Sequence, residues 1–462
     1  MLAGGGGNGA RSEGMVVRES PMRVSIIGTG HVGLVTGVCL AEVGHEVLCV
    51  DIDERKIADL KQGRVPFYEP GLEKLLQRHA NHSLHFATKI AEALTWSDTV
   101  FICVGTPQSA DGSADLDALN TIVRDIARDA HGYHLVVEKS TVPVRTARSL
   151  SGILSSGSST DAKFEVAAVP EFLREGSAIA DTLHPDRIVI GVESKSAATQ
   201  LTEIFQPMDC PIVITDLATA EIIKHASNSF LAMKISYINA VAAICESTGA
   251  DVAIVAHAMG LDHRIGSEFL EAGIGYGGSC FPKDVAAFSS VARDAGLDFD
   301  LLEVVQQINA KQRIRIVDKI RESVDGLNGR KVAVLGLSFK PNTDDIQESP
   351  AVDIVRHLVA EGASVKAYDP QAMATARGEL GDIVMYASDA YDAMEGANAL
   401  VLLTDWEEFR SLDWARVSEL LETPLVVDGR NLWDPSMVSA AGLTYLGVGR
   451  GMTGRQGAEA LS

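Results

Sequence analysis

The sequence predicts an α/β protein with two doubly wound, Rossmann-like domains joined by a long central helix. Three observations indicate this fold. An apolar strand, a glycine turn, a helix and a second strand ending in aspartate occur in this order near the start of the chain. The same order recurs after Gly326, and residues 212–248 between the two contain neither glycine nor proline. Alternating strands and helices are typical of parallel sheets covered by helices on both faces.

The first domain carries a turn pattern typical of dinucleotide binding. The apolar run at 23–28 leads into the sequence GTGHVG, a helix-like stretch, and a strand ending at Asp51. A GxGxxG pattern alone is weak evidence, but this context matches the full fingerprint. Glycines let a helix N-terminus approach a pyrophosphate, and Asp51 would bind the ribose hydroxyls and repel a 2′-phosphate. The sequence therefore predicts NAD as the cofactor, with the site residues Gly28, Gly30, Val32, Gly33, Asp51 and Lys56.

Two threonines follow later apolar strands of this domain. Further strands are expected at 99–104, 135–138 and 187–190, and Thr106 and Thr141 follow the first two. Ligands of open parallel sheets bind beyond the carboxyl ends of the strands, so both threonines are candidates for facing cofactor or substrate. The alternative is that both cap helices, a common role for threonine before proline.

The segment without glycine or proline is expected to be one long helix. At 1.5 Å per residue it would reach roughly 55 Å, which is longer than one small domain needs. Such a helix joins domains or packs against a partner's copy, so we expect at least a homodimer. Lys224 and Asn228 are four residues apart and share one face, although spacing alone is also consistent with an ordinary solvated face.

The second doubly wound domain begins with KVAVLGLSF and continues to a strand ending at Asp369. Its glycine turn lacks the full phosphate fingerprint, so a ligand other than a second dinucleotide is expected there. The predicted organisation is a disordered extension at 1–21, an NAD-binding domain at 22–210, a central helical dimerisation domain at 211–322, a sugar-nucleotide-binding domain at 323–450 and a loose tail at 451–462.

Composition limits the class of protein. The 462 residues carry a formal net charge of −22 at pH 7, which argues against nucleic acid or an anionic membrane as partner. No continuous apolar run approaches the 18 or so residues that a membrane span needs, so no span is expected. The six cysteines show no CxxC spacing, which predicts no metal site and no disulfide framework and favours the cytoplasm. We expect Cys39, Cys49 and Cys103 in the core.

The run GGSCFPKD at 277–284 places Cys280 where a structural cysteine gains little. Two glycines and a serine permit a sharp bend and close approach of another molecule, so Cys280 is expected to be exposed. Lys283 supplies a cation that favours thiolate, and Asp284 supplies a carboxylate for handling a proton or a water. The alternative is a glycine-rich turn with a passive thiol.

A nucleophilic cysteine beside NAD changes the chemistry that the protein can perform. A simple alcohol oxidation needs a base and no cysteine. A thiol captures an aldehyde as a thiohemiacetal, which loses a second hydride to give a thioester that water releases as an acid. The combination predicts oxidation to the carboxylate level.

An ordered series of motifs resembles the UDP-glucose 6-dehydrogenase family from about residue 22 to about 447. The motifs are GTGHVGL at 28–34, VDIDERKI at 50–57, VGTP at 104–107, KSTVP at 139–143, PEFLREG at 170–176, HPDRIVIG at 184–191, the middle helix, the segment 261–284, FKPNTDDIQESPA at 339–351 and DGRN at 428–431. The resemblance implies oxidation of UDP-glucose with two NAD in succession, through a thiohemiacetal and a thioester on Cys280.

The resemblance also implies residue roles. Lys224 and Asn228 would stabilise the oxyanion, and Asp284 would transfer protons through a water held by Thr141 and Glu171. Cofactor contacts are expected from Thr106, Thr141, Glu175, Lys283 and Gln347, with Glu175 beside the nicotinamide and helping to position the hydrolytic water. Substrate contacts are expected from Glu171, Phe172, Leu173, Arg174, Glu175, Lys224, Asn228, Arg264, Phe269, Leu270, Glu271, Ala272, Gly273, Gly277, Lys340 and Arg430, with Arg264 and Lys340 meeting the phosphates.

The sequence departs from the family pattern at three positions. Val169 stands where Asn is frequent, and Ala240 stands where glutamate is found. Gln347 stands where the family usually has an Arg, at a position expected to contact NAD. None of them removes a proposed catalytic group. The alternatives are another nucleotide-sugar dehydrogenase, acting on GDP-mannose or a UDP-N-acetylhexosamine, a catalytically silent nucleotide-sugar binding protein, and a hydroxyacid dehydrogenase with the same long helix.

Overall fold

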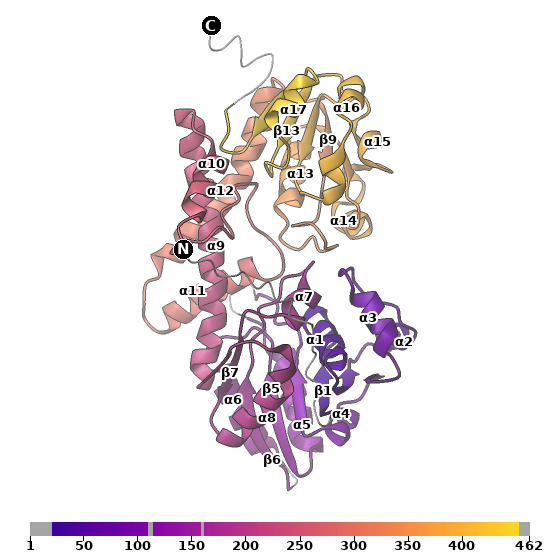
Figure 1. Ribbon diagram of the computed structural model, residues 1–462, viewed down its shortest axis with the longest axis vertical. Helices are drawn as coiled ribbons and strands as arrows, with labels where there is room; N and C mark the ends of the chain where they lie inside the picture. The colour runs from indigo at the N-terminus through magenta and orange to yellow at the C-terminus, as the bar shows by residue number, and fades with distance from the viewer. Residues whose placement is uncertain (1–20, 110–113, 159–160, 452–462) are drawn as a thin grey trace, which may run out of the picture.

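The computed structural model describes residues 21–109, 114–158 and 161–451. The predicted N-terminal extension and C-terminal tail fall on residues outside these ranges, apart from Pro21 and Gly451. The chain forms two α/β lobes, one above the other, with long helices along one side (Figure 1).

The N-terminal lobe is built on an eight-stranded sheet with the order β3-β2-β1-β4-β5-β6-β7-β8. Its first six strands run parallel in the 3-2-1-4-5-6 order of a dinucleotide-binding sheet, and β7 turns antiparallel to β6. These strands form where β-branched and apolar residues cluster, because the sheet is buried on both faces. The strands are β1 (Arg23–Ile27), β2 (Glu46–Val50), β3 (Leu84–Ala87), β4 (Thr99–Ile102), β5 (Tyr133–Glu138), β6 (Lys163–Ala168), β7 (Ile188–Val192) and β8 (Ile212–Thr215).

Helices cover both faces of this sheet and enclose two hydrophobic clusters. Cys39, Cys49 and Cys103 are buried in one of them, as predicted. The helices of this lobe are α1 (His31–Glu42), α2 (Glu54–Lys61), α3 (Leu72–His79), α4 (Ile90–Trp96), α5 (Asp117–Asp129), α6 (Thr146–Gly157), α7 (Ala178–Leu183) and α8 (Lys195–Phe205).

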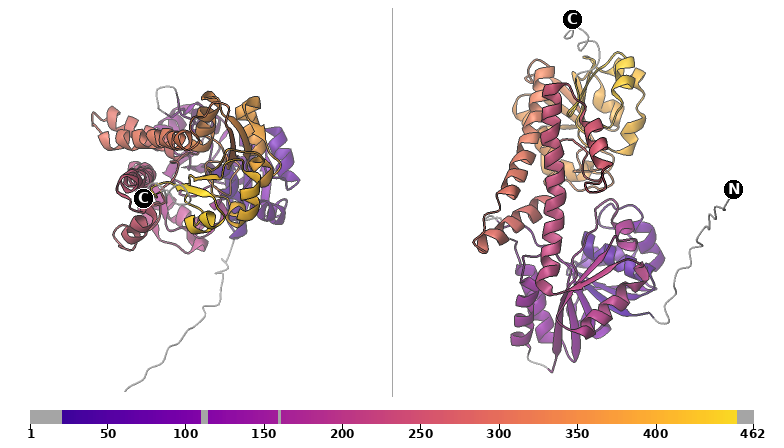
Figure 2. Two further views of the ribbon diagram at one scale, coloured as in Figure 1. Left: turned by 90° about the horizontal axis from the view of Figure 1, so that it is seen from above. Right: turned by 60° about the vertical axis from the view of Figure 1, so that its left-hand side comes forward.

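Helix α9 (Leu217–Thr248) runs alongside both lobes (Figure 2). Asp216 caps its first turn by accepting from the Thr219 N–H, and Gly249 ends it in the left-handed conformation. Helices α11 (Phe281–Asp294) and α12 (Asp300–Ser323) pack against α9, and α10 (Val252–Gly260) follows it in the chain. Together they join the two sheets.

By length and hydropathy alone, α9 is able to cross a membrane. Its most apolar 18-residue window has a mean hydropathy of 1.2, and 44% of that window is buried inside the protein. The expectation that no segment could span a membrane is therefore wrong for α9 by this criterion, because the mean over the window stays at 1.2 although isolated polar residues interrupt its apolar run. Lys224, Asn228 and Asn239 of this helix are buried among other parts of the fold, which is the behaviour of a core helix.

The C-terminal lobe contains a parallel six-stranded sheet with the order β11-β10-β9-β12-β13-β14, which repeats the 3-2-1-4-5-6 pattern. The predicted pair of doubly wound domains is thus confirmed. The strands are β9 (Lys331–Leu335), β10 (Ser364–Tyr368), β11 (Met385–Tyr386), β12 (Ala399–Leu402), β13 (Leu425–Asp428) and β14 (Thr444–Gly447), and the helices are α13 (Pro350–Ala360), α14 (Met373–Leu380), α15 (Ala390–Met394), α16 (Trp414–Leu420) and α17 (Pro435–Ala440).

Asp369 shows why the second glycine turn is not a second dinucleotide site. It is fully buried, and one of its carboxylate oxygens accepts hydrogen bonds from the backbone of Leu337 and Ser338 and from the Trp406 indole. Asp369 therefore has no exposed surface for a ribose hydroxyl, whereas the Asp51 side chain keeps some.

Candidate active site

A cavity of about 1360 Å³ lies between the two lobes, beside α9. Its walls come from the glycine turn after β1, the ends of β4 and β5, the loop after β6, α9, the segment 268–283 and the loop 339–348. The carboxyl ends of parallel strands meet here, which is where open α/β sheets bind ligands.

The glycine turn fits a dinucleotide. A Cβ on Gly28 would lie 2.7 Å from the Cys103 carbonyl oxygen, and a Cβ on Gly33 would lie 1.9 Å from the Gly28 carbonyl oxygen, so both positions require glycine. Gly30, in contrast, has open space where a Cβ would stand, and it lines the cavity. A phosphate can approach the first turn of α1 closely at this point.

Asp51 lies at the end of β2, beside this turn. One of its carboxylate oxygens accepts from the Thr29 backbone N–H at 2.9 Å and from the Thr29 hydroxyl at 2.6 Å, and Lys56 Nζ lies 3.1 Å from the same oxygen. Burial favours the neutral acid, but these hydrogen bonds outweigh it and lower the pKa of Asp51. The carboxylate is thus ionised and held where a ribose is expected.

Cys280 stands at the N-terminus of α11, and the glycines before it have a definite steric reason. A Cβ on Gly277 would lie 2.2 Å from the Glu348 carbonyl oxygen, and one on Gly278, whose φ is +87°, would meet the Phe339 ring at 2.7 Å. The cysteine segment therefore packs directly on the loop 339–348 of the C-terminal lobe.

The surroundings of Cys280 differ from the prediction. The thiol is partly buried, and burial together with Glu171, Asp284 and Glu175 raises the pKa of Cys280 to about 12, against a smaller opposing effect of Lys224. The expectations of an exposed cysteine and of a thiolate favoured by Lys283 are therefore wrong. Lys283 Nζ lies instead 3.2 Å from Asp284 and 3.4 Å from Thr106.

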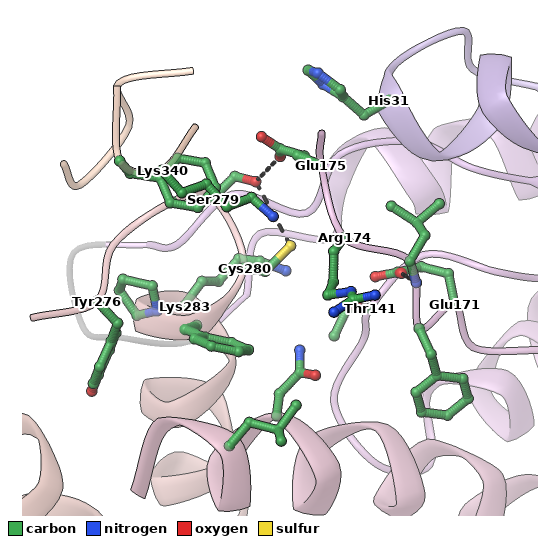
Figure 3. A pocket seen from close by; sticks show the side chains of 18 of the residues that line it. His31, Thr141, Glu171, Arg174, Glu175, Tyr276, Ser279, Cys280, Lys283 and Lys340 are labelled. Atoms are coloured by element: carbon green, nitrogen blue, oxygen red, sulfur yellow. Dashed lines mark hydrogen bonds between the residues drawn. The ribbon is translucent and has the colours of Figure 1, made fainter. Parts of the chain in front are cut away.

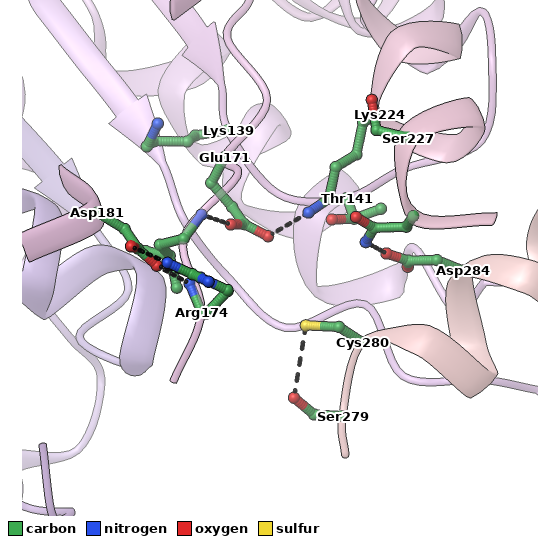
Figure 4. A network of polar contacts seen from close by, with 12 residues as sticks. Lys139, Thr141, Glu171, Arg174, Asp181, Lys224, Ser227, Ser279, Cys280 and Asp284 are labelled. Atoms are coloured by element: carbon green, nitrogen blue, oxygen red, sulfur yellow. Dashed lines mark hydrogen bonds and ion pairs between the residues drawn. The ribbon is translucent and has the colours of Figure 1, made fainter. Parts of the chain in front are cut away.

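Lys224 and Glu171 form a buried ion pair at the base of the cavity. Lys224 Nζ lies 2.7 Å from Glu171 Oε1, and the other oxygen of Glu171 accepts from the Leu173 backbone N–H at 2.8 Å (Figure 4). Burial opposes the charge of Lys224, but Glu171 and the other acidic groups nearby outweigh it and raise the pKa of Lys224. The ammonium is therefore maintained where it faces Cys280.

Asn228 lies one helical turn beyond Lys224 on α9. Its amide donates to Asp284 Oδ2 at 2.6 Å, so the amide orientation is fixed. Asp284 itself has no exposed surface and does not line the cavity, whereas Asn228 does. The Asp284 carboxylate thus contacts the site through Asn228 and Lys283.

Thr106 and Thr141 meet at the carboxyl ends of the central strands. The Thr106 hydroxyl donates to the Thr141 carbonyl at 2.6 Å, and both residues line the cavity. Neither heads a helix in the structure, so the capping alternative does not apply.

Comparison with known proteins identifies the family. Sequence models of the UDP-glucose/GDP-mannose dehydrogenase family match residues 22–209 as its NAD binding domain, 218–311 as its central domain and 333–435 as its UDP binding domain. The chain belongs to the UDP-glucose/GDP-mannose dehydrogenase family. The family resemblance and the NAD cofactor predicted from the motifs are thereby confirmed.

Several members of the family are similar over nearly the whole chain. UDP-glucose 6-dehydrogenase TuaD of Bacillus subtilis is 48% identical over 429 residues, covering 93% of each chain. UDP-glucose 6-dehydrogenase of Rhizobium meliloti is 45% identical over 437 residues, covering 93% of this chain and 100% of the relative. The solved UDP-glucose dehydrogenase of Pyrobaculum islandicum superposes with a TM-score of 0.87 at 40% identity, covering 95% of this chain and 100% of that one.

The structure brings most residues predicted for this dehydrogenase site into one cavity. Those lining it are Gly30, Val32, Thr106, Thr141, Glu171, Phe172, Leu173, Arg174, Glu175, Lys224, Asn228, Phe269, Glu271, Gly273, Gly277, Cys280, Lys283, Lys340, Gln347 and Arg430. Leu270 and Ala272 are buried behind the wall. Arg264 does not line the cavity, and its side chain is 78% exposed and paired with Asp262.

Sequence reasoning passed over three residues that the structure brings into the site. Ser279 was considered only as part of a bend, yet its hydroxyl contacts Cys280 and Glu175. Asp345 belongs to the FKPNTDDIQESPA motif, and its carboxyl group lies beside that of Glu175. Arg187, from the HPDR motif, stacks on the Phe172 ring at 3.7 Å and lines the cavity. Their neighbours are remote in sequence, so spacing alone carried no signal for them.

Proposed function

We propose that this protein is an NAD-dependent UDP-glucose 6-dehydrogenase that oxidises the C6 alcohol of UDP-glucose to a carboxylate. The observation that carries the proposal is one cavity holding a thiol, a buried ammonium and an amide donor within reach of the dinucleotide turn. A cysteine at the site implies capture of an aldehyde, and therefore oxidation beyond the alcohol-to-carbonyl step.

The residues of the site have separate roles in the proposed reaction. When bound, NAD accepts the hydride in each of the two oxidations. Lys224 and Asn228 donate to the oxygen at C6, where negative charge develops when the Cys280 sulfur attacks the aldehyde. The buried Glu171 keeps Lys224 charged and in place. Asp284 fixes the amide of Asn228 and, through a water held by Thr141 and Glu171, takes part in proton transfer.

The second lobe supplies the nucleotide side of the site. Lys340 and Arg430 line the cavity from this lobe, and Arg430 is anchored by donating to the carbonyls of Leu403 and Phe339 at 2.8 and 3.0 Å. Two cations at this wall suit the diphosphate of a UDP-sugar. Glu175 and Lys283 approach the cofactor from the opposite lobe.

The proposed enzyme is a homodimer that is built on α9. Tyr237 and Ile244 lie seven residues apart on one side of α9 and are 53% and 62% exposed. An apolar stripe of this spacing is typical of a helix that packs against a second helix. Arg264, which is exposed outside the cavity and paired with Asp262, would have to exchange this partner to meet the phosphates of a site in the assembled dimer. We place the enzyme in the cytoplasm, where the cysteines stay reduced.

The substrate is tested by incubating the purified protein with NAD and a panel of nucleotide sugars. We expect two NADH per UDP-glucose consumed, and little turnover of GDP-mannose or UDP-N-acetylhexosamines. The solved UDP-D-ManNAc dehydrogenase of Pyrococcus horikoshii is 28% identical and shares the fold with a TM-score of 0.81, so N-acetylated sugars are the necessary comparison. Faster turnover of such a sugar would assign the substrate to that branch, and one NADH per sugar would exclude the four-electron reaction.

A further inference from the structure

The cavity contains a short polar chain that the roles above do not use. It starts at Cys280 Sγ, which lies 3.7 Å from the Ser279 hydroxyl oxygen, within hydrogen-bond distance for sulfur. The Ser279 hydroxyl donates in turn to Glu175 Oε1 at 3.0 Å. Figure 3 shows the three side chains in sequence from the sulfur to the carboxylate.

The direction of these hydrogen bonds follows from the donors available. A serine hydroxyl has one proton, and an ionised carboxylate only accepts. Since Ser279 gives its proton to Glu175, the contact with Cys280 requires the thiol to donate to the Ser279 oxygen. The chain is therefore already arranged to move a proton from sulfur to carboxylate.

Among the described residues, the other acidic and basic groups around Cys280 make no hydrogen bond to its thiol. Both carboxylate oxygens of Glu171 are engaged, one by Lys224 and one by the Leu173 N–H. Lys224 is an ammonium and has no lone pair to accept a proton. Asp284 lies off the cavity wall, bound to Asn228 and beside Lys283. In the part of the chain that the structure describes, Ser279 offers the one side-chain hydrogen bond to the thiol.

Glu175 is held by the C-terminal lobe. Its second oxygen accepts from the Thr343 hydroxyl at 3.3 Å, and the carboxyl group of Asp345 lies beside it. The other charged groups facing this carboxyl pair are Lys340, His31 and Glu69. Burial and the neighbouring carboxylate raise the pKa of Asp345 to about 6, and burial raises the pKa of Glu175. Like charges in one buried site increase the affinity of the pair for a proton, so the pair is suited to receive one.

We propose that Ser279 relays the proton of the Cys280 thiol to Glu175, and that Ser279 is thereby a catalytic residue of the aldehyde-oxidising half of the reaction. This inference rests on the proposed function. The S–H bond of Cys280 breaks as its proton passes to the Ser279 oxygen, and the original Ser279 proton passes to Glu175 Oε1. The sulfur electron pair forms the S–C6 bond, and the C6=O π electrons move to the oxygen beside Lys224. Asp345 is a positioning residue, because it acts on the thiol only through Glu175.

The relay is tested by separating the two oxidations. In a single turnover with UDP-glucose, the first hydride transfer needs no thiol, whereas oxidation of supplied UDP-glucose 6-aldehyde does. We expect Ser279→Ala to slow aldehyde oxidation by about 10²-fold, as for loss of general acid–base catalysis, and to leave the first hydride transfer within about twofold. Ser279→Thr keeps the hydroxyl and should restore most of the rate. Ser289→Ala, which removes a hydroxyl bonded to the Val285 carbonyl on the same helix, is the matched control.

A second readout needs neither NAD nor sugar. Alkylation of Cys280 by iodoacetamide, followed by intact-protein mass spectrometry with Cys280→Ser as the blank, reports how readily the thiolate forms. Ser279→Ala should slow it by at least about tenfold, because it removes the hydroxyl that takes up the thiol proton. Glu175→Gln removes the acceptor but also a negative charge that raises the pKa of Cys280, so its readout is aldehyde oxidation, which it should slow by about 10²-fold. Glu175→Gln preserves the shape of the side chain, and it tests the relay if Ser279→Ala does not fold.

The outcomes separate the inference from the proposed function. Aldehyde oxidation and alkylation at wild-type rates in Ser279→Ala would overturn the relay. Equal slowing of both oxidations would also overturn it, since that result indicates a merely structural serine. A wild-type protein that produces no NADH from UDP-glucose would instead refute the proposed function, and the alkylation rates would still test the relay.

Discussion

Replacing Lys224 by methionine tests whether the buried ion pair on α9 organises the site. Lys224 and Glu171 are 3% and 5% exposed, and their charged atoms lie 2.7 Å apart. Removing one partner of a buried pair costs about 3–5 kcal/mol, because the other charge is left buried. The Leu173 N–H still donates to Glu171, and Lys139 lies nearby, so we expect the lower end, about 3 kcal/mol. At about 2–4 °C per kcal/mol for a domain of this size, the melting temperature should fall by about 6–12 °C.

Differential scanning calorimetry of the ligand-free protein measures this shift. Lys74→Met, at an exposed lysine of α3, is the matched control and should melt with the wild type. The double variant Lys224→Met/Glu171→Gln removes both charges and should recover part of the loss. A Lys224→Met protein that melts within about 2 °C of wild type, or a double variant less stable than either single one, would refute the reasoning.

Three further predictions follow from other parts of the molecule. Asp51→Asn should reduce the preference for NAD over its 2′-phosphorylated form at least tenfold in kcat/KM, because the charge that repels the 2′-phosphate is removed. The control Asp53→Asn, at an exposed neighbour, should leave the preference unchanged. An unchanged preference in Asp51→Asn would show that Asp51 does not contact the ribose. Ile244→Asp on α9 should give a monomer of 49.1 kDa by light scattering. The same substitution at an exposed isoleucine of the C-terminal lobe, Ile383→Asp, should leave the dimer intact. A wild-type protein that is monomeric at micromolar concentration would contradict the proposed homodimer. Thr343→Val should move the acid limb of aldehyde oxidation to higher pH, because the Thr343 hydroxyl donates to Glu175 and lowers its pKa, so that without this hydroxyl Glu175 is protonated in less acid solution; an unmoved limb would separate Glu175 from the proton path.

Local patterns were sufficient to predict the parts of the fold that depend on neighbouring residues. The order of apolar strand, glycine turn and helix predicts both sheets, and Asp51 is found because it ends the strand after the turn. The long helix is predicted from the segment without glycine or proline, and it begins at Leu217 because Asp216 caps it.

Local sequence patterns could not predict the direction in which the pKa of Cys280 is shifted. The carboxylates that raise the pKa of Cys280 include Glu171 and Glu175, which belong to the other side of the cavity and to a distant part of the sequence. Lys283 is only three residues from Cys280 in the sequence, which predicted a cation beside the thiol, but on α11 its ammonium contacts Asp284 and Thr106. Ser279 was overlooked for the same reason, since its partner Glu175 is supplied by the loop after β6.

The central claim is that Cys280 carries the substrate as an acyl group. Intact-protein mass spectrometry of Asp284→Asn, mixed with UDP-glucose and NAD, tests it directly. Asp284 fixes Asn228 and assists proton transfer, so the variant should release acid slowly and accumulate a thioester, seen as one UDP-sugar-sized adduct that is absent from Cys280→Ser. Cys280→Ser should bind UDP-glucose normally and lose turnover. Normal turnover by Cys280→Ser, or the same adduct on that variant, would contradict the covalent account.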